Sequence, residues 1–199
     1  MNDANELPDR WSWDHKTRPP ELRVNLIVRP RLLHILDEGV QGRLTLLHAP
    51  AGYGKTTLLA QWRETSIARG RAAAWLSFEE EDDDPTELLS HLVAALSSVI
   101  PSLQLTNDGR RAGGDARGMI AELAGKLASA DSVTLILDEY HLASSPRVHD
   151  LVMQFVRAIP ENVRVVIASR FRGTFPISTL KADRKSTRLN SSHRTGSRM

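Results

Sequence analysis

The sequence predicts an α/β fold, a three-layer sandwich in which helices cover both faces of a parallel β-sheet. Short apolar runs of strand length alternate with longer segments whose apolar residues recur at helical spacing. The runs contain few polar residues, which is typical of parallel strands that are buried on both faces. Alternation of this kind along the chain favours a single parallel sheet.

Local signals place the elements in order. Asp84 can cap a helix that starts at Pro85, and Glu87 can reach back in a capping box. Gly70 has the usual position just after a helix, and Pro160 closes the last one. The expected strands span 44–47, 72–78, 133–137 and 163–168, and the expected helices lie near 32–36, 55–69, 85–100, 120–127 and 146–159.

Six consecutive acids, residues 79–84, follow the second expected strand. Such a run could in principle hold a metal ion. Carboxylates that repel one another in a solvated loop are the simpler interpretation, and a solvated loop is therefore expected here.

A glycine-rich turn between the first strand and the next helix is the strongest functional signal. Backbone N–H groups in such a turn cradle phosphate oxygens, and the helix N-terminus adds partial positive charge. Lys55 would reach the β- and γ-phosphates, and the Thr56 hydroxyl would ligate Mg²⁺. The pattern predicts a P-loop NTPase, although Ala49 stands where the pattern begins with glycine. The nucleotide-binding residues would be Ala51, Gly52, Tyr53, Gly54, Lys55, Thr56 and Thr57.

An acid pair should complete this site from the end of a neighbouring buried strand. Asp138 would hold the Mg²⁺ shell, and Glu139 would orient or deprotonate the attacking water. Lys55 and Glu139 are therefore the candidate catalytic residues. Arg170 ends the next strand along the chain and could sense the γ-phosphate or bridge to another domain, whereas His141 favours a structural contact.

Adenine is the expected base. The chain contains no Asn-Lys-x-Asp motif of the kind that reads guanine, and Asp138 is not followed at the usual spacing by a switch glycine. The predicted cofactors are therefore ATP and Mg²⁺.

Composition restricts the class further. The chain has no cysteine, which excludes disulfides and thiolate chemistry. Its start lacks the apolar segment of a signal peptide, and no apolar run approaches the roughly 20 residues of a membrane span, so a cytoplasmic protein without membrane contact is expected.

Of 26 basic and 24 acidic residues, five basic and one acidic lie in 183–199. The remaining net charge of −2 gives no argument for nucleic-acid binding by the body.

Residues 183–199 lack any regular apolar period and resemble a translated sequencing-library adapter. The alternative is a disordered basic tail that binds nucleic acid. The expected organisation is a loose lead-in at 1–20, a P-loop ATPase core at 21–182 and a non-native tail at 183–199. A genomic sequence that encodes residues 183–199 at the native locus would contradict this interpretation.

The P-loop block and several flanking motifs resemble the ATP-binding domain of the large LuxR-family transcriptional regulators, of the type of the bacterial maltose-regulon activator. The resemblance runs from about Thr17 to Ala182, and its specific part is Ala-Gly-Tyr-Gly-Lys-Thr-Thr. Weaker matches are the segments at 28–33, 75–78, 137–141 and 167–170.

The resemblance implies a switch of the signal-transduction class of P-loop proteins. In such a switch ADP holds a resting monomer, ATP with an inducer permits self-association, and slow hydrolysis resets the state. It also places Val28 and Arg29 near the adenine. DNA would be bound only through a C-terminal helix-turn-helix, which we do not expect within these residues. We also do not expect them to supply the family's further strand beside the P-loop strand, so the core is expected to be truncated before its last strand.

Two other functions stay open at this stage. A stand-alone P-loop enzyme, such as a small-molecule kinase, would need a substrate-binding acid near the first helix and an arginine-bearing lid, and neither is clear. The other is a related signalling ATPase that does not act through DNA binding. Only the family-like P-loop block favours the transcriptional regulator over this alternative.

Overall fold

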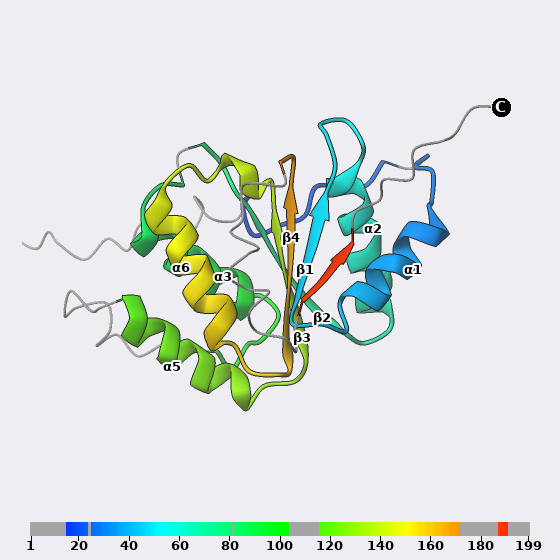
Figure 1. Ribbon diagram of the computed structural model, residues 1–199. Helices are drawn as coiled ribbons and strands as arrows, with labels where there is room; N and C mark the ends of the chain where they lie inside the picture. Colours follow the sequence, from blue (N-terminus) through cyan, green and yellow to red (C-terminus); the bar gives the residue numbers. More distant parts are fainter. Residues whose placement is uncertain (1–14, 24, 81, 104–115, 172–186, 191–199) are drawn as a thin grey trace, which may run out of the picture.

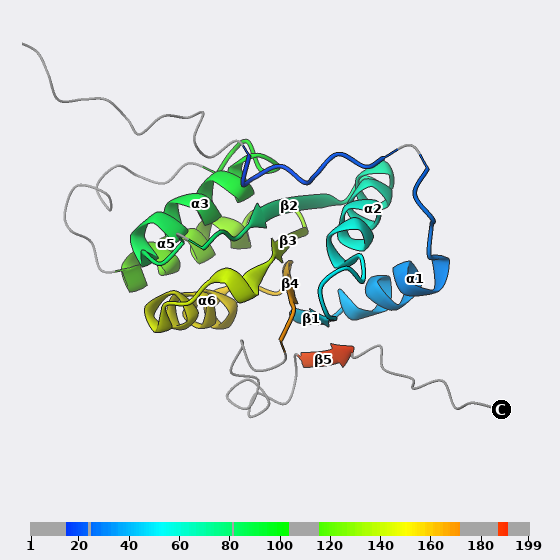
Figure 2. The same cartoon turned by 90° about the horizontal axis from the view of Figure 1, so that it is seen from above.

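A parallel sheet lies between two layers of helices, as the sequence predicts (Figures 1 and 2). The computed structural model describes residues 15–23, 25–80, 82–103, 116–171 and, for the backbone alone, 187–190. One face of the sheet carries α3 (Pro85–Ser97), α5 (Ala116–Ala128) and α6 (Pro146–Ala158), and the other carries α1 (Pro30–Gly39) and α2 (Lys55–Ala68). A short 3-10 helix, η1 (Tyr140–Leu142), precedes α6.

The strand order of the sheet is β2-β3-β4-β1-β5, and every neighbouring pair is parallel. The strands are β1 (Leu44–His48), β2 (Ala72–Ser77), β3 (Val133–Asp138), β4 (Val163–Ser169) and β5 (Thr187–Asn190). Because the strands are parallel, their carboxyl ends meet along one edge of the sheet. The turns after β1, β3 and β4 therefore lie at the same edge.

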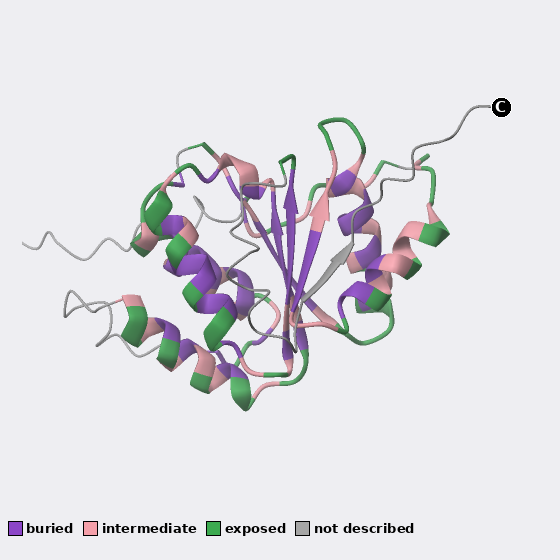
Figure 3. Cartoon of the chain, viewed as in Figure 1, coloured by how far each residue is buried: buried purple, intermediate pink, exposed green. Residues whose placement is uncertain are grey.

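The core has two parts, one on each face of the sheet. The larger part packs α3, α5 and α6 against the strands and includes the fully buried Leu89, Leu123 and Phe155. The smaller part lies beneath α1 and α2 and includes Trp62 and Trp75. Figure 3 shows the same division, with buried residues on the inner faces of the helices and exposed residues outside. The helical apolar spacing in the sequence thus matches the buried faces.

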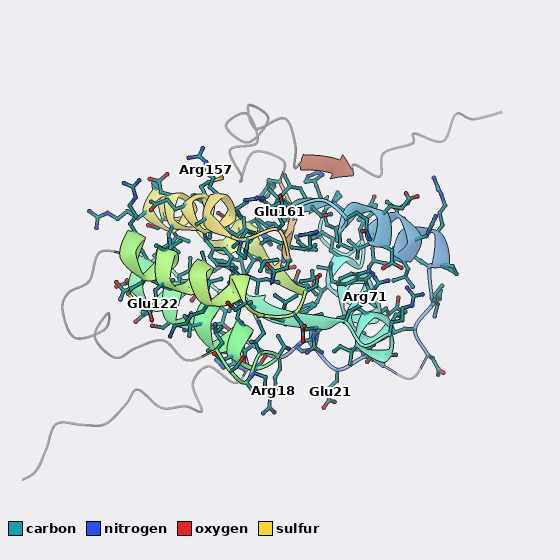
Figure 4. All side chains as sticks on the ribbon, turned by 90° about the horizontal axis from the view of Figure 1, so that it is seen from below. Arg18, Glu21, Arg71, Glu122, Arg157 and Glu161 are labelled. Atoms are coloured by element: carbon teal, nitrogen blue, oxygen red, sulfur yellow. The ribbon has the colours of Figure 1, made fainter. Side chains whose placement is uncertain are left out.

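The outer faces of the helices carry charged side chains. Figure 4 shows Glu122 on α5 and Arg157 on α6 projecting outward, and Arg71 lies beside the end of α2. Arg71 and Arg157 are exposed. No helix in the described part of the chain is long and apolar enough to cross a bilayer.

The sheet differs from expectation at both sides of β1. We expected an empty position beside the P-loop strand, but β5 pairs with β1, with Leu44 opposite Thr187 and Leu47 opposite Asn190. The edge of β1 presents a row of backbone N–H and C=O groups, and pairing through them does not need a periodic side-chain pattern. The adapter origin of 183–199 stays a prediction, and 1–14, 104–115, 172–186 and 191–199 lie outside the described residues.

We expected the strand that ends in Asp138 to lie next to the P-loop strand, but it does not. β4 lies between β1 and β3, and Val165 pairs with Leu44 on one side and with Leu135 on the other. Local patterns do not specify the order in which parallel strands are crossed. This insertion brings the end of β4, and with it Arg170, between the P-loop and Asp138 at the sheet edge.

The acidic run after β2 is not simply a solvated loop, which corrects our interpretation. Asp82 is 5% exposed, and its Oδ1 lies 2.6 Å from the Nζ of Lys16. Glu79 Oε2 lies 3.2 Å from the same Nζ, and the backbone N–H of Ser77 donates to the Lys16 carbonyl oxygen. Lys16 therefore holds the end of the expected lead-in against β2. Next in the run, Asp84 caps α3 by accepting from the Thr86 N–H, as predicted.

We expect Asp82→Asn to destabilise the fold by about 2 kcal/mol, because it removes the shorter of the two charged contacts of the buried Lys16 ammonium and leaves only Glu79. Burial lowers the pKa of Lys16, but hydrogen bonding and charge attraction from Asp82 and Glu79 outweigh this and raise it. The charged contacts of Lys16 therefore contribute fully to the free energy of unfolding at pH 7, and this contribution is lost as the pH rises through the raised pKa of Lys16. Urea denaturation at pH 7 measures the effect, with the exposed Glu80→Gln as control. Equal stability of the two variants would contradict the structural role of the pair.

Candidate nucleotide site

The turn between β1 and α2 has the backbone geometry that a phosphate loop needs. Gly52 and Gly54 have φ of 78° and 73°, a left-handed conformation that favours glycine. Ala49, which replaces the usual first glycine, is not among the described residues with positive φ, so its methyl group is compatible with the loop. Gly54 caps α2, and the free N–H groups of the first helical turn point toward the mouth of the loop.

Lys55 is held inside this loop. Its side chain is buried, and Nζ donates to the carbonyl oxygens of Ala49 at 2.8 Å and Pro50 at 3.2 Å. An ammonium has three donors, so one N–H is left for a ligand oxygen. Burial lowers the pKa of Lys55, while the charges of Glu139 and Asp138 act to raise it.

Asp138 ends β3 as a buried carboxylate, 1% exposed, beside the start of α2. Burial raises its pKa, and hydrogen bonds from the Thr56 side chain and the Glu139 backbone act against that rise. Its Oδ1 has no hydrogen-bond partner among the described residues. A buried carboxylate oxygen without a partner is costly, which indicates that a cation or a water completes the site.

Glu139, Arg170 and His141 converge on one point at the sheet edge. Arg170 Nη2 donates to Glu139 Oε2 at 3.0 Å, and the Nε2 of His141 lies 3.5 Å from the same oxygen. The His141 side chain is only 4% exposed, and its ring meets the edge of Phe171 with centroids 6.0 Å apart. The four predicted residues Lys55, Asp138, Glu139 and Arg170 are thus brought together, and His141 joins them.

Arg29 reaches the phosphate loop from the N-cap of α1. Its Nη1 donates to the carbonyl oxygen of Tyr53 at 3.1 Å, and a Cβ placed on Gly54 would collide with its guanidinium. Tyr53, within the loop, is 64% exposed and can meet a ligand there, and Val28, next to Arg29 in the chain, is 59% exposed. The place of Val28 and Arg29 beside the adenine stays a prediction.

Comparison with protein-family models decides the class, because the AAA domain model matches residues 39–170, from before β1 to the end of β4. The chain belongs to the AAA domain family. It is a P-loop nucleotide-binding domain of AAA type, and the α/β prediction is confirmed.

Curated relatives of this AAA domain include regulators and a kinase. The HTH-type transcriptional regulator MalT of Vibrio cholerae is 31% identical over 174 residues, which cover 85% of this chain and 18% of that protein. The serine/threonine-protein kinase PknK of Mycobacterium tuberculosis is 31% identical over 173 residues, which cover 83% of this chain and 15% of that protein. The chain thus spans less than a fifth of these relatives, and the resemblance to the large LuxR-type regulators is confirmed.

Among solved structures, the Drosophila origin recognition complex bound to poly(dA/dT) DNA and Cdc6 contains a chain with the same fold. The TM-score is 0.52 at 14% identity, and the match covers 81% of this AAA domain and 28% of that chain. At this identity the likeness shows the fold alone.

The donor set of this AAA domain fits Mg²⁺. The Thr56 hydroxyl and the Asp138 carboxylate are both oxygen ligands, which Mg²⁺ prefers, and the unpartnered Oδ1 of Asp138 offers a coordination position. A Mg²⁺ ion held by only one or two protein oxygens usually keeps several water ligands and takes its remaining ligands from the phosphates of the substrate. Lys55, on the same side of the sheet edge, would meet those phosphates.

Sequence reasoning missed two features of this region. It did not predict the left-handed backbone of Glu139 (φ 52°, ψ 29°), for which no local signal exists because the residue is not glycine. It also missed the hydrogen bond between the Tyr140 hydroxyl and His149 Nδ1, 2.7 Å apart. The apolar environment of Tyr140, next to a strand end, could have indicated that its hydroxyl needs a partner.

Proposed function

We propose that this AAA domain is an ATP/ADP-binding regulatory switch module of a LuxR-type transcriptional regulator, with Mg²⁺-dependent ATP binding and slow hydrolysis. The observation that carries the proposal is the phosphate loop that holds the buried Lys55 ammonium, together with the buried Asp138 carboxylate, whose Oδ1 has no hydrogen-bond partner among the described residues and which accepts from the Thr56 side chain. Phosphate-binding groups that follow β1 and acidic groups at the end of β3 thus lie at the same edge of the sheet. That is the arrangement needed for a metal-bound triphosphate.

The chain's own residues divide the work in this proposal. The loop amides and Lys55 bind the β- and γ-phosphates, and Thr56 and Asp138 hold Mg²⁺, which neutralises charge on the phosphate oxygens. Glu139 accepts a proton from the attacking water. Arg170, already beside Glu139 at 3.0 Å, is placed to contact the γ-phosphate. Val28 and Arg29 border the base.

The wider partners follow from the regulator type. Self-association in the ATP state, an inducer and DNA contact through a separate C-terminal domain are proposed for the full-length protein. A cytoplasmic location belongs to the same proposal, since the switch needs the cellular ATP pool.

A signalling ATPase with another output is the second candidate. The match to a protein named serine/threonine-protein kinase PknK supports it, because a similar domain then occurs beside a different activity. The same phosphate chemistry would serve either output. No observation among the described residues specifically favours a stand-alone P-loop enzyme.

Mg²⁺ dependence tests the shared core of these proposals. Asp138→Asn keeps the shape of the side chain but removes the negative charge that would hold the ion. We expect Mg²⁺ to tighten ATP binding to the unmodified protein by at least about tenfold, and we expect this gain to vanish in the variant. Calorimetric titration with and without EDTA measures both. An identical Mg²⁺ effect in the variant would show that Asp138 is not a metal ligand, and Asp150→Asn on α6 is the matched control.

A further inference from the structure

Glu139 has a backbone conformation that residues with side chains rarely adopt. Its φ is 52° and its ψ is 29°, and it is the only non-glycine with positive φ among the residues that the structure describes. Such a conformation persists only where the surroundings hold it, and it is often found at functional sites. The contacts of the neighbouring residues hold Glu139 in this conformation.

The support begins at the next residue. Tyr140 is completely buried, and its hydroxyl shares a hydrogen bond of 2.7 Å with Nδ1 of His149, one turn into α6. Its ring meets the ring of Phe78 edge-on, with centroids 5.1 Å apart and an interplanar angle of 81°. The Phe78 N–H in turn donates to the carbonyl oxygen of Asp138 at 3.0 Å. Tyr140 is therefore fixed by a helix on one side and by the segment after β2 on the other.

The carboxylate of Glu139 has two neighbours. It pairs with Arg170, whose side chain is 42% exposed, and a partly exposed ion pair of this kind stabilises little. The Nε2 of the buried His141 side chain lies 3.5 Å from the same carboxylate oxygen, which is too long for a strong hydrogen bond. The backbone of Glu139 is instead locked into η1, where its carbonyl oxygen accepts from the Leu142 N–H at 2.9 Å. The direction of the Glu139 side chain thus depends on where Tyr140 sits.

We propose that Tyr140 is a positioning residue that, through its hydrogen bond with His149, holds Glu139 in the left-handed conformation and so aims its carboxylate at the attacking water. The inference rests on the proposed function, because it gives Glu139 its role in hydrolysis. It assigns α6 a part in the site although no α6 side chain touches Glu139 in the described contacts. Placement by a rigid neighbour matters here, since a small displacement of a catalytic group lowers the rate.

Two substitutions isolate the hydrogen bond. Tyr140→Phe keeps the buried ring and removes the hydroxyl, and His149→Leu removes the partner from the other side. His149→Asn should restore function, because its side-chain oxygen lies close to the position of Nδ1. Trp62→Phe is the control, since it removes the partly buried hydrogen bond of another aromatic, to Asp37 Oδ1 at 2.9 Å, on the opposite face of the sheet.

Two measurements on the full chain decide the matter. We expect Tyr140→Phe and His149→Leu to lower kcat for ATP hydrolysis about tenfold while the Kd for ATP stays within about twofold, with His149→Asn near the unmodified value. Amide hydrogen exchange at Leu142 should accelerate in the same two variants without nucleotide. An unchanged kcat in Tyr140→Phe, or an equal fall in Trp62→Phe, would overturn the inference.

The exchange measurement separates this inference from the proposed function. If the unmodified chain binds ATP without hydrolysing it, the hydrolytic part of the proposed function fails. Leu142 exchange then decides the positioning role by itself. Faster exchange in Tyr140→Phe supports it, and unchanged exchange rejects it.

Discussion

We expect Lys55→Ala to abolish ATP binding by this domain. The ammonium of Lys55 lies within the phosphate loop, hydrogen-bonded to the carbonyl oxygens of Ala49 and Pro50, and has one N–H left for the β- and γ-phosphates. Removing it takes away the cation of the phosphate loop, while the negative charges of Asp138 and Glu139 stay near the phosphates. A charge-assisted contact of this kind contributes about 2–3 kcal/mol, and the added repulsion from the two acids should raise the Kd by at least about a hundredfold.

Calorimetric titration with Mg-ATP measures this loss, and circular dichroism shows whether the variant folds. Lys126→Ala makes the same substitution on α5, where Lys126 pairs with Glu122 at 3.1 Å, and should leave the Kd unchanged. Undiminished binding by a folded Lys55→Ala variant would place the nucleotide elsewhere.

We expect Glu139→Gln to keep ATP binding and to slow hydrolysis by at least about a hundredfold, the usual contribution of a general base. Glutamine has nearly the same shape and can still meet Arg170, but it cannot accept the proton of the attacking water. A single-turnover assay with saturating Mg-ATP measures the chemical step apart from product release. Glu161→Gln, at an exposed position before β4, is the control. Unchanged turnover would show that Glu139 is not the base.

Much of the fold could be predicted because its signals are local. The strand, turn and helix around Gly52, Gly54 and Lys55 are contiguous, and the chemistry of each residue type is tied to its place in that unit. The cap at Asp84 and the helix end at Gly70 depend likewise on neighbouring backbone groups. These features were predicted with nearly correct boundaries.

Features that join distant segments could not be predicted in the same way. Lys16 and Asp82 are 66 residues apart, and nothing in a run of six acids indicates which one is buried. The placement of β4 between β1 and β3 depends on crossover connections that local patterns do not determine. Arg170 could be predicted as a strand-end cation, but its contact with Glu139 follows only from that strand order. The pairing of β5 with β1 was missed for a related reason, since it depends on an open strand edge.

The most direct test of the central claim is a titration of the unmodified domain with Mg-ATP, followed through the backbone amide signals of the phosphate loop. The account predicts that the amides of Gly52, Gly54, Lys55 and Thr56 shift together and saturably, because their N–H groups line the phosphate site. Saturable binding that leaves these four amides unmoved and shifts signals elsewhere would contradict it.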